Sequence, residues 1–294
     1  MLPHRLPIPD VGHGATHSSH AVAREEKRNY IESMAAARLG SWVWAIVIVA
    51  VFWALPTLAG PPFRTDDPEP VDYEHWEFYA ATQYENDRGS LSGTAPHFET
   101  NYGVAPDVQL HLLAPDAYSR AKDGPTLFGP GDVELGVKYR FIQESDYVPM
   151  VGIYPLLEAP TGSKARGLGT GRPQLFFPVW LQKSAGPWTS YGGGGYWINP
   201  GTGNRDYWFA GWLLQRDITK WLTFGAEIFH QTPSFTGGQS ETGYNAGAII
   251  NFTDVHHFLC SAGTDIHGPA NFFFYAAYYL TWGPPKAGEK ESPR

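Results

Sequence analysis

Residues 131–141, "GDVELGVKYRF", alternate between two kinds of side chain at every position. One side of the extended chain would carry Val133, Leu135, Val137, Tyr139 and Phe141. The other side would carry Asp132, Glu134, Gly136, Lys138 and Arg140. A period of two is typical of a β-strand whose faces meet different environments. A soluble sandwich would turn the charged face outward, whereas an outer-membrane barrel would turn it toward a water-filled lumen.

From His75 onward the chain divides into twelve segments of strand length, separated by Gly, Pro, Asn and Asp. No stretch of ten or more residues has a convincing helical pattern. The segments are 75–85, 96–105, 107–114, 131–142, 148–158, 173–183, 188–198, 205–216, 221–231, 243–252, 258–266 and 272–282. Two of them fit less well: 173–183 is apolar on both faces, and Gly192–Gly195 in 188–198 predict a weak strand or a bulge.

The connections between these segments alternate in length. Long connections follow the odd-numbered segments, as in "NDRGSLSGTA" (86–95) and "APTGSKARGLGTGR" (159–172), and short ones follow the even-numbered segments, as in "DITK" (217–220). A barrel with short periplasmic turns, longer outer loops and an even number of strands has this pattern. A Greek-key sandwich has no reason to sort its loops in this way.

The charged face of 131–141 can now be assigned. In a membrane barrel, each basic side chain turned to lipid at the midplane would cost about 2–4 kcal/mol, and the acidic ones somewhat less. The sequence therefore predicts an all-β protein: a closed, antiparallel, up-and-down transmembrane β-barrel of about twelve strands in the bacterial outer membrane, with its charged faces toward the lumen.

The chain before the barrel divides into three parts. Residues 34–59 have Arg38, an apolar run and small residues before Gly60, which predicts a cleavable signal peptide, with an uncleaved membrane anchor as the alternative. Residues 1–33 lack apolar periodicity and are expected to be a disordered extension. Met34 would serve as a start codon, so this extension is a possible mis-annotated start. Residues 60–74 predict a periplasmic segment before the barrel at 75–283, and 284–294 a disordered tail.

Composition limits the chemistry. The formal net charge of −8 argues against a nucleic-acid partner, and Cys260, the single cysteine, excludes an intrachain disulfide framework. No cofactor is predicted. A metal site is not predicted either, although His256 and His257 lie near Asp254 in an expected turn, because a stable site needs more ligands.

The order and spacing of several motifs resemble the outer-membrane "MetA-pathway of phenol degradation" family. The motifs are "PFRTDDPEPVDYEHWEF" (62–78), "GDVELGVKYRF" (131–141), "LLEAPTG" (156–162), "GYWINPG" (195–201) and "LLQRDITKWLTFGAEIF" (213–229). The resemblance covers about residues 62–282. It implies a membrane β-barrel, a link to aromatic compounds by association, and no assigned catalytic residues. The chain departs from many outer-membrane barrels in that "GPPKAGEKESPR" follows Trp282.

The predicted lumen residues are polar or charged and lie on the inward faces. They are Glu77, Glu99, Gln109, His111, Asp132, Glu134, Lys138, Arg140, Glu158, Glu227 and Asp265. They would form either a salt-bridged network in a nearly closed interior or a pathway for small polar or aromatic solutes. We hypothesise that segment 60–74 enters the lumen as a plug, with Asp66 and Asp67 meeting Lys138 or Arg140.

The predicted function is a passive outer-membrane channel for small solutes, and its expected partners are outer-membrane lipid, the solute and the barrel-assembly machinery. Two alternatives remain: a structural or adhesive barrel without transport, and a barrel-embedded hydrolase. Enzyme activity is not predicted, because the chain has no G-x-S-x-G elbow. Sequence alone does not show whether His111 or His230 meets a Ser or Asp.

Overall fold

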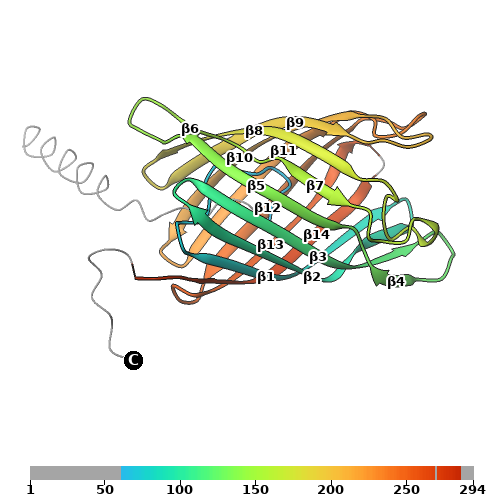
Figure 1. Cartoon of the computed structure of the whole chain (residues 1–294), viewed down its shortest axis with the longest axis horizontal. Helices are drawn as coiled ribbons and strands as arrows, with labels where there is room; N and C mark the ends of the chain where they lie inside the picture. The colour runs from blue at the N-terminus through green and yellow to red at the C-terminus, as the bar shows by residue number, and fades with distance from the viewer. Residues whose placement is uncertain (1–60, 269, 286–294) are drawn as a thin grey trace, which may run out of the picture. The chain divides into compact units, whose positions relative to one another are not determined.

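The computed structural model describes residues 61–268 and 270–285. The extension (1–33), the signal peptide (34–59), residue 60 and all but two residues of the predicted tail (284–294) lie outside the described residues. Within the described part, one antiparallel sheet closes on itself, because the first and last strands pair and Trp76 lies opposite Trp282 (Figure 1). Among these residues, no helix has both the length and the hydropathy to span a membrane.

Fourteen strands make up the sheet in the described residues. They are β1 (Trp76–Asp87), β2 (Ser90–Ala105), β3 (Val108–Arg120), β4 (Leu127–Pro130), β5 (Val133–Ile142), β6 (Met150–Ile153), β7 (Leu156–Ala159), β8 (Gln174–Ala185), β9 (Trp188–Ile198), β10 (Tyr207–Thr219), β11 (Leu222–Gln231), β12 (Glu241–Asn251), β13 (His256–His267) and β14 (Ala270–Trp282). The one helical element in this described part of the chain is a 3₁₀ turn, η1 (Lys164–Arg166).

These fourteen strands correspond to twelve strands of the barrel, because two barrel strands are each interrupted once. Both β4 and β5 pair with β3, so together they are one barrel strand, interrupted at residues 131–132. In the same way, β6 and β7 both lie between β5 and β8 and form one barrel strand. The predicted closed antiparallel barrel of about twelve strands is confirmed.

The predicted loop at 86–95 is wrong. β1 and β2 continue to Asp87 and from Ser90, and a two-residue turn at Arg88 and Gly89 joins them. Both turn residues have positive φ, 49° and 96°, as a type I′ hairpin turn requires. The polar residues that suggested a loop thus belong to strand ends. The long connections that remain are at 160–173, 199–206 and 232–240.

The four consecutive glycines do not produce a bulge. β9 pairs with β8 from Trp188 to Ile198 and with β10 from Trp188 to Trp197, in both cases without a register shift. A Cβ on Gly192 would lie 2.5 Å from Cε3 of Trp212, so the glycine makes room for the indole on the outer face. The indole N–H donates to Ser190 Oγ at 2.9 Å. The apolar inward side of 173–183 also has a role, because Phe176 and Trp180 are buried inside the barrel.

The outer face of the barrel is apolar. In β5, Leu135, Val137 and Tyr139 are exposed, whereas Lys138 between them is 4% exposed. Large exposed apolar side chains on other strands include Phe98, Leu110, Phe177, Trp212, Phe224, Ile228, Tyr244 and Phe274. Soluble monomers rarely expose apolar patches larger than a few hundred Å². The apolar side chains therefore face lipid and the ionic ones face the interior, as predicted.

This arrangement predicts a depth-dependent cost for a charge on the outer face. Ile228 lies near the middle of β11 and Ile218 at the end of β10, and they are 52% and 51% exposed. We expect Ile228→Arg to lower the free energy of unfolding by about 2–4 kcal/mol and Ile218→Arg by no more than about 1 kcal/mol. Urea denaturation in lipid vesicles measures both values. Equal costs for the two variants would contradict the lipid-facing assignment of β11.

Candidate functional site

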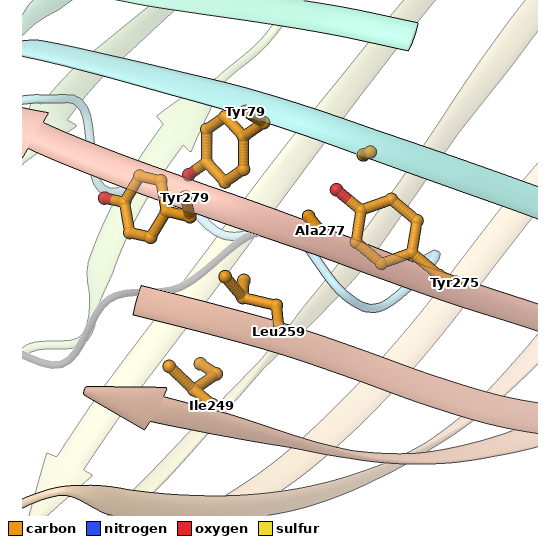
Figure 2. Close-up of a cluster of buried hydrophobic side chains, with 7 residues drawn as sticks. Tyr79, Ile249, Leu259, Tyr275, Ala277 and Tyr279 are labelled. Atoms are coloured by element: carbon orange, nitrogen blue, oxygen red, sulfur yellow. The ribbon is translucent and has the colours of Figure 1, made fainter. Parts of the chain in front are cut away.

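The interior of the barrel has two unlike walls. One wall carries a chain of carboxylates and their partners on β1, β2, β3 and β5. The other carries aromatic rings on β8, β9, β10, β11 and β14. The two walls meet near β14, where inward-facing tyrosines occur. In Figure 2, Tyr79 and Tyr279 lie side by side on neighbouring strands, and their ring centroids are 4.3 Å apart.

We call the rings of Trp197, Phe176, Phe209, Phe229 and Phe273 the aromatic arc. Successive centroids in this order are 4.7, 6.5, 6.3 and 5.6 Å apart. Phe229 and Phe273 meet across β12 and β13 because those strands carry glycines beneath the rings. A Cβ on Gly243 would lie 2.5 Å from Phe229 Cζ, and one on Gly263 2.4 Å from Phe273 Cε2. The arc is thus continuous over half of the barrel.

The carboxylate wall is a hydrogen-bonded network. His111 Nε2 lies 3.0 Å from Glu134 Oε1, and its Nδ1 lies 2.8 Å from Asn101 Oδ1. Asn101 donates to Glu99 at 2.9 Å and to Glu77 at 3.3 Å. Glu77 also accepts a hydrogen bond of 2.6 Å from the Tyr279 hydroxyl. Satisfying buried carboxylates in this way reduces the cost of removing them from water.

Residues 61–74, which we call the inner segment, run through the interior and contact side chains of β1, β3, β5, β8, β11 and β12. Its backbone is held by inward-facing side chains. Glu227 of β11 accepts from the N–H groups of Arg64 and Thr65, at 2.8 and 2.7 Å. Gln109 of β3 accepts from Val71 N–H at 2.9 Å. The segment leaves the interior beside β2, where Glu74 N–H donates to the Gly103 carbonyl.

Two basic groups hold the inner segment at separate places. The Arg64 guanidinium lies 2.6 Å from Glu241 Oε1 and 3.0 Å from Glu85 Oε2, and it stacks on Phe229 and Phe273 at 4.7 and 4.3 Å from the ring centroids. The other basic group, Lys138 of β5, reaches the segment from the wall.

Lys138 Nζ lies 3.0 Å from Asp66 Oδ1 and 3.5 Å from Asp67 Oδ1. Asp67 is fully buried. Burial raises the pKa of the Asp67 carboxyl well above its usual value, and the Lys138 charge opposes this shift. Burial also raises the pKa of the Glu69 carboxyl, and the hydrogen bond of 3.0 Å from Gln182 opposes it.

A cavity of about 480 Å³ remains beside the inner segment. Its lining includes Arg64 of the segment, the carboxylates of Glu85, Glu99 and Glu241, and the rings of Phe273 and Tyr275. The cavity therefore joins the carboxylate wall to the end of the aromatic arc.

The predicted lumen residues have different surroundings. Glu77, Glu99, Gln109, His111, Glu134, Lys138 and Glu227 take part in the contacts described above. Arg140 does not meet the inner segment through an ion pair; it pairs with Asp107 near the β2–β3 turn, at 2.6 Å. Asp132 accepts from Gly162 and Thr170 and so orders the 160–173 loop.

The last two predicted residues lie toward strand ends. Glu158 of β7 lies opposite Glu134 of β5 in the sheet register. Asp265 of β13 lies opposite Gly243 of β12.

Three residues that meet in the interior were not predicted from the sequence: Arg64 and its two carboxylate partners, Glu85 and Glu241. Glu85 could have been found, because its spacing of eight from Glu77 puts both on one face of a strand. Glu241 lies just before the predicted segment 243–252, so its face was not assigned. Arg64 lies in a Pro-rich segment without periodicity, so the sequence does not indicate which way its side chain points.

The histidines considered for chemistry have other partners. His256 Nδ1 lies 2.7 Å from the Tyr278 hydroxyl, and His257 Nδ1 2.8 Å from Asn251 Oδ1. His230 is on the outer face, next to Thr242. Over residues 61–268 and 270–285, no three His, Cys, Asp or Glu residues lie close enough to hold a metal ion.

Comparison with solved structures shows a similar barrel. An outer-membrane channel from Pseudomonas putida F1 matches 76% of this chain and 100% of its own, with a TM-score of 0.61 and 15% identity. The translocator domain of autotransporter NalP from Neisseria meningitidis matches 85% of this chain and 98% of its own, but its TM-score of 0.48, at 11% identity, carries no argument. No family model and no curated protein sequence matches the chain.

At 15% identity this likeness shows the fold alone. The closed barrel and its apolar outer face independently require a membrane, because water would not solvate such a surface. The chain is a β-barrel of the bacterial outer membrane, and lipid contacts its outer face.

Proposed function

We propose that the protein is a passive outer-membrane channel for small solutes, and that the inner segment is its plug. The observation that carries this proposal is the cavity of about 480 Å³, lined by carboxylates and aromatic rings. A barrel that served only stability would fill its interior with packed side chains, as eight-stranded barrels do. A barrel of twelve strands encloses more space than its inward-facing side chains fill, and here the inner segment occupies part of that space.

The lining suits solutes that combine a polar group with a flat apolar body. Carboxylates and hydrogen-bonding groups replace part of the water around a polar group, and the rings of the aromatic arc offer faces for stacking. This agrees with the resemblance to the "MetA-pathway of phenol degradation" family, by which aromatic compounds are expected. Export through a signal peptide at 34–59 and insertion by the barrel-assembly machinery belong to the same proposal.

The two alternatives make different demands on the interior. A structural or adhesive barrel does not need a separate segment held inside it by ion pairs, and a hydrolase needs a nucleophile beside a base. Within the described residues, the interior histidine His111 contacts Asn101, Glu134 and Glu99. A second buried histidine, His97, lies 2.6 Å from the Thr94 hydroxyl. Neither histidine has a serine among these partners, so they do not form the Ser–His pair of the usual hydrolase mechanism.

Ion conductance across a planar bilayer tests the proposal. A channel gives discrete current steps after the purified barrel is added, and solutes that enter the lumen reduce the current. A structural barrel would leave the bilayer insulating whether the plug is held or released. Hydrolysis of a lipid or peptide substrate by the pure protein would instead support the enzyme.

A further inference from the structure

The cavity beside Arg64 has an excess of negative charge. Three carboxylates line it, those of Glu85, Glu99 and Glu241, and one permanently charged cation, Arg64. Its volume of about 480 Å³ lies within the range of about 300–1,000 Å³ that is typical of small-molecule sites. The space is therefore large enough for a small organic molecule, and its charge favours a cation.

Arg64 shows how a cation is held there. Its guanidinium contacts Glu241 at 2.6 Å and Glu85 at 3.0 Å, and its central carbon lies over two ring faces, those of Phe229 and Phe273. Two carboxylates and two aromatic faces are the features that recognise an organic cation, through charge-assisted hydrogen bonds and cation–π contact. In this structure a residue of the plug is the cation.

Two buried polar atoms around the cavity have no partner. Asn245 Oδ1 and the Tyr275 hydroxyl belong to lining residues that are 2% and 8% exposed, and neither atom makes a hydrogen bond within the described residues. The amide nitrogen of Asn245 is used, since it donates to Glu227 and Ser261. An unpaired buried acceptor is costly, and an N–H group of a bound molecule would satisfy it.

We propose that this cavity binds small organic cations in which a guanidinium, amidinium or ammonium group is attached to an aromatic or other apolar body. Such a cation competes with Arg64 for Glu85 and Glu241, while its body lies against Phe273 and Tyr275. Each carboxylate that it takes from Arg64 weakens one contact of the plug. This inference rests on the proposed channel function, because it names the solute class and links solute binding to release of the plug.

Three probes of nearly the same shape test the charge preference: benzamidine (cation), benzamide (neutral) and benzoate (anion). Their binding to the whole mature protein in detergent is measured by isothermal titration calorimetry. We expect benzamidine to bind at least about tenfold more tightly than either of the others, because only its charge is matched by the lining. Equal binding of the three probes would overturn the proposal.

Two variants test the contacts in opposite directions. Glu241→Gln removes one carboxylate, and we expect it to weaken benzamidine binding about tenfold. Arg64→Gln removes the competing cation, and we expect it to strengthen binding several-fold. Glu144→Gln is the control, since Glu144 pairs with Lys183 near the β5–β6 turn, at 2.8 Å, and does not line the cavity; it should leave the affinity unchanged.

The Arg64→Gln result keeps the test decisive, because a misfolded variant loses affinity and cannot gain it. Weaker or unchanged binding in Arg64→Gln would overturn the competition with Arg64. Bilayer conductance separates this proposal from the channel itself. Selective benzamidine binding without conductance leaves the cation site standing and removes the channel, whereas conductance without selective binding does the reverse.

Discussion

Replacing residues 61–74 with a Gly/Ser linker of equal length should raise the single-channel conductance by at least about tenfold, since a twelve-stranded barrel encloses more space than its own side chains fill. The inner segment contacts β1, β3, β5, β8, β11 and β12 through side chains that face the interior. With the segment in place, ions can cross only through the gaps that it leaves. Planar-bilayer recordings of the two proteins give the ratio.

The barrel itself should survive this replacement. Closure depends on the β1–β14 ladder, which runs from Trp76 to Asp87 and uses no residue of the segment. Circular dichroism and heat-dependent electrophoretic mobility should therefore match the wild type. A folded replacement variant with wild-type conductance would contradict the assignment of the inner segment as the plug.

Lys138→Met should lower the free energy of unfolding by about 3–5 kcal/mol, the usual cost of removing one partner from a buried ion pair. Methionine keeps the length and apolar stem of lysine, so the change removes mainly the charge. Asp67 is fully buried and Asp66 is partly buried, and both would lose their ammonium partner. Urea denaturation of the protein in lipid vesicles measures the loss.

Two further variants show whether the charge is responsible. Lys183→Met is the control: Lys183 pairs with Glu144, its side chain is 40% exposed, and the loss should not exceed about 1 kcal/mol. Adding Asp66→Asn and Asp67→Asn to Lys138→Met should restore most of the stability, because no buried charge is then left unpaired. A loss for Lys138→Met as small as that for Lys183→Met would show that the buried pair is unimportant.

The barrel could be predicted because its signal is local. Alternation in 131–141 assigns two faces to a strand, and the cost of charges in lipid then decides which face is inside. The predicted loop at 86–95 was wrong for an equally physical reason: polar residues at strand ends and in a true loop are alike, and only the positive φ of Arg88 and Gly89 marks the hairpin.

The interior could be predicted only in part. The faces of Glu99, His111, Lys138 and Glu227 follow from strand periodicity, but their partners depend on strand register and on the path of the inner segment. The positions of the glycines in the strands also did not show which of them lie beneath a side chain from another strand. Gly243 and Gly263 are needed because rings from other strands lie over them, which is a three-dimensional relation that no local pattern contains.

A reversible tether tests the central claim, that the inner segment closes a lumen able to conduct. A Cβ on Gly211 of β10 would lie 3.1 Å from Thr65 Cβ, so Thr65→Cys and Gly211→Cys in a Cys260→Ser background can form a disulfide after a shift of about half an ångström. We predict that the oxidised protein carries only the small current that crosses the gaps beside the held segment, and that dithiothreitol adds larger current steps when the segment is released, while Cys260→Ser alone does not respond. Equal current in the oxidised and reduced proteins would contradict the account.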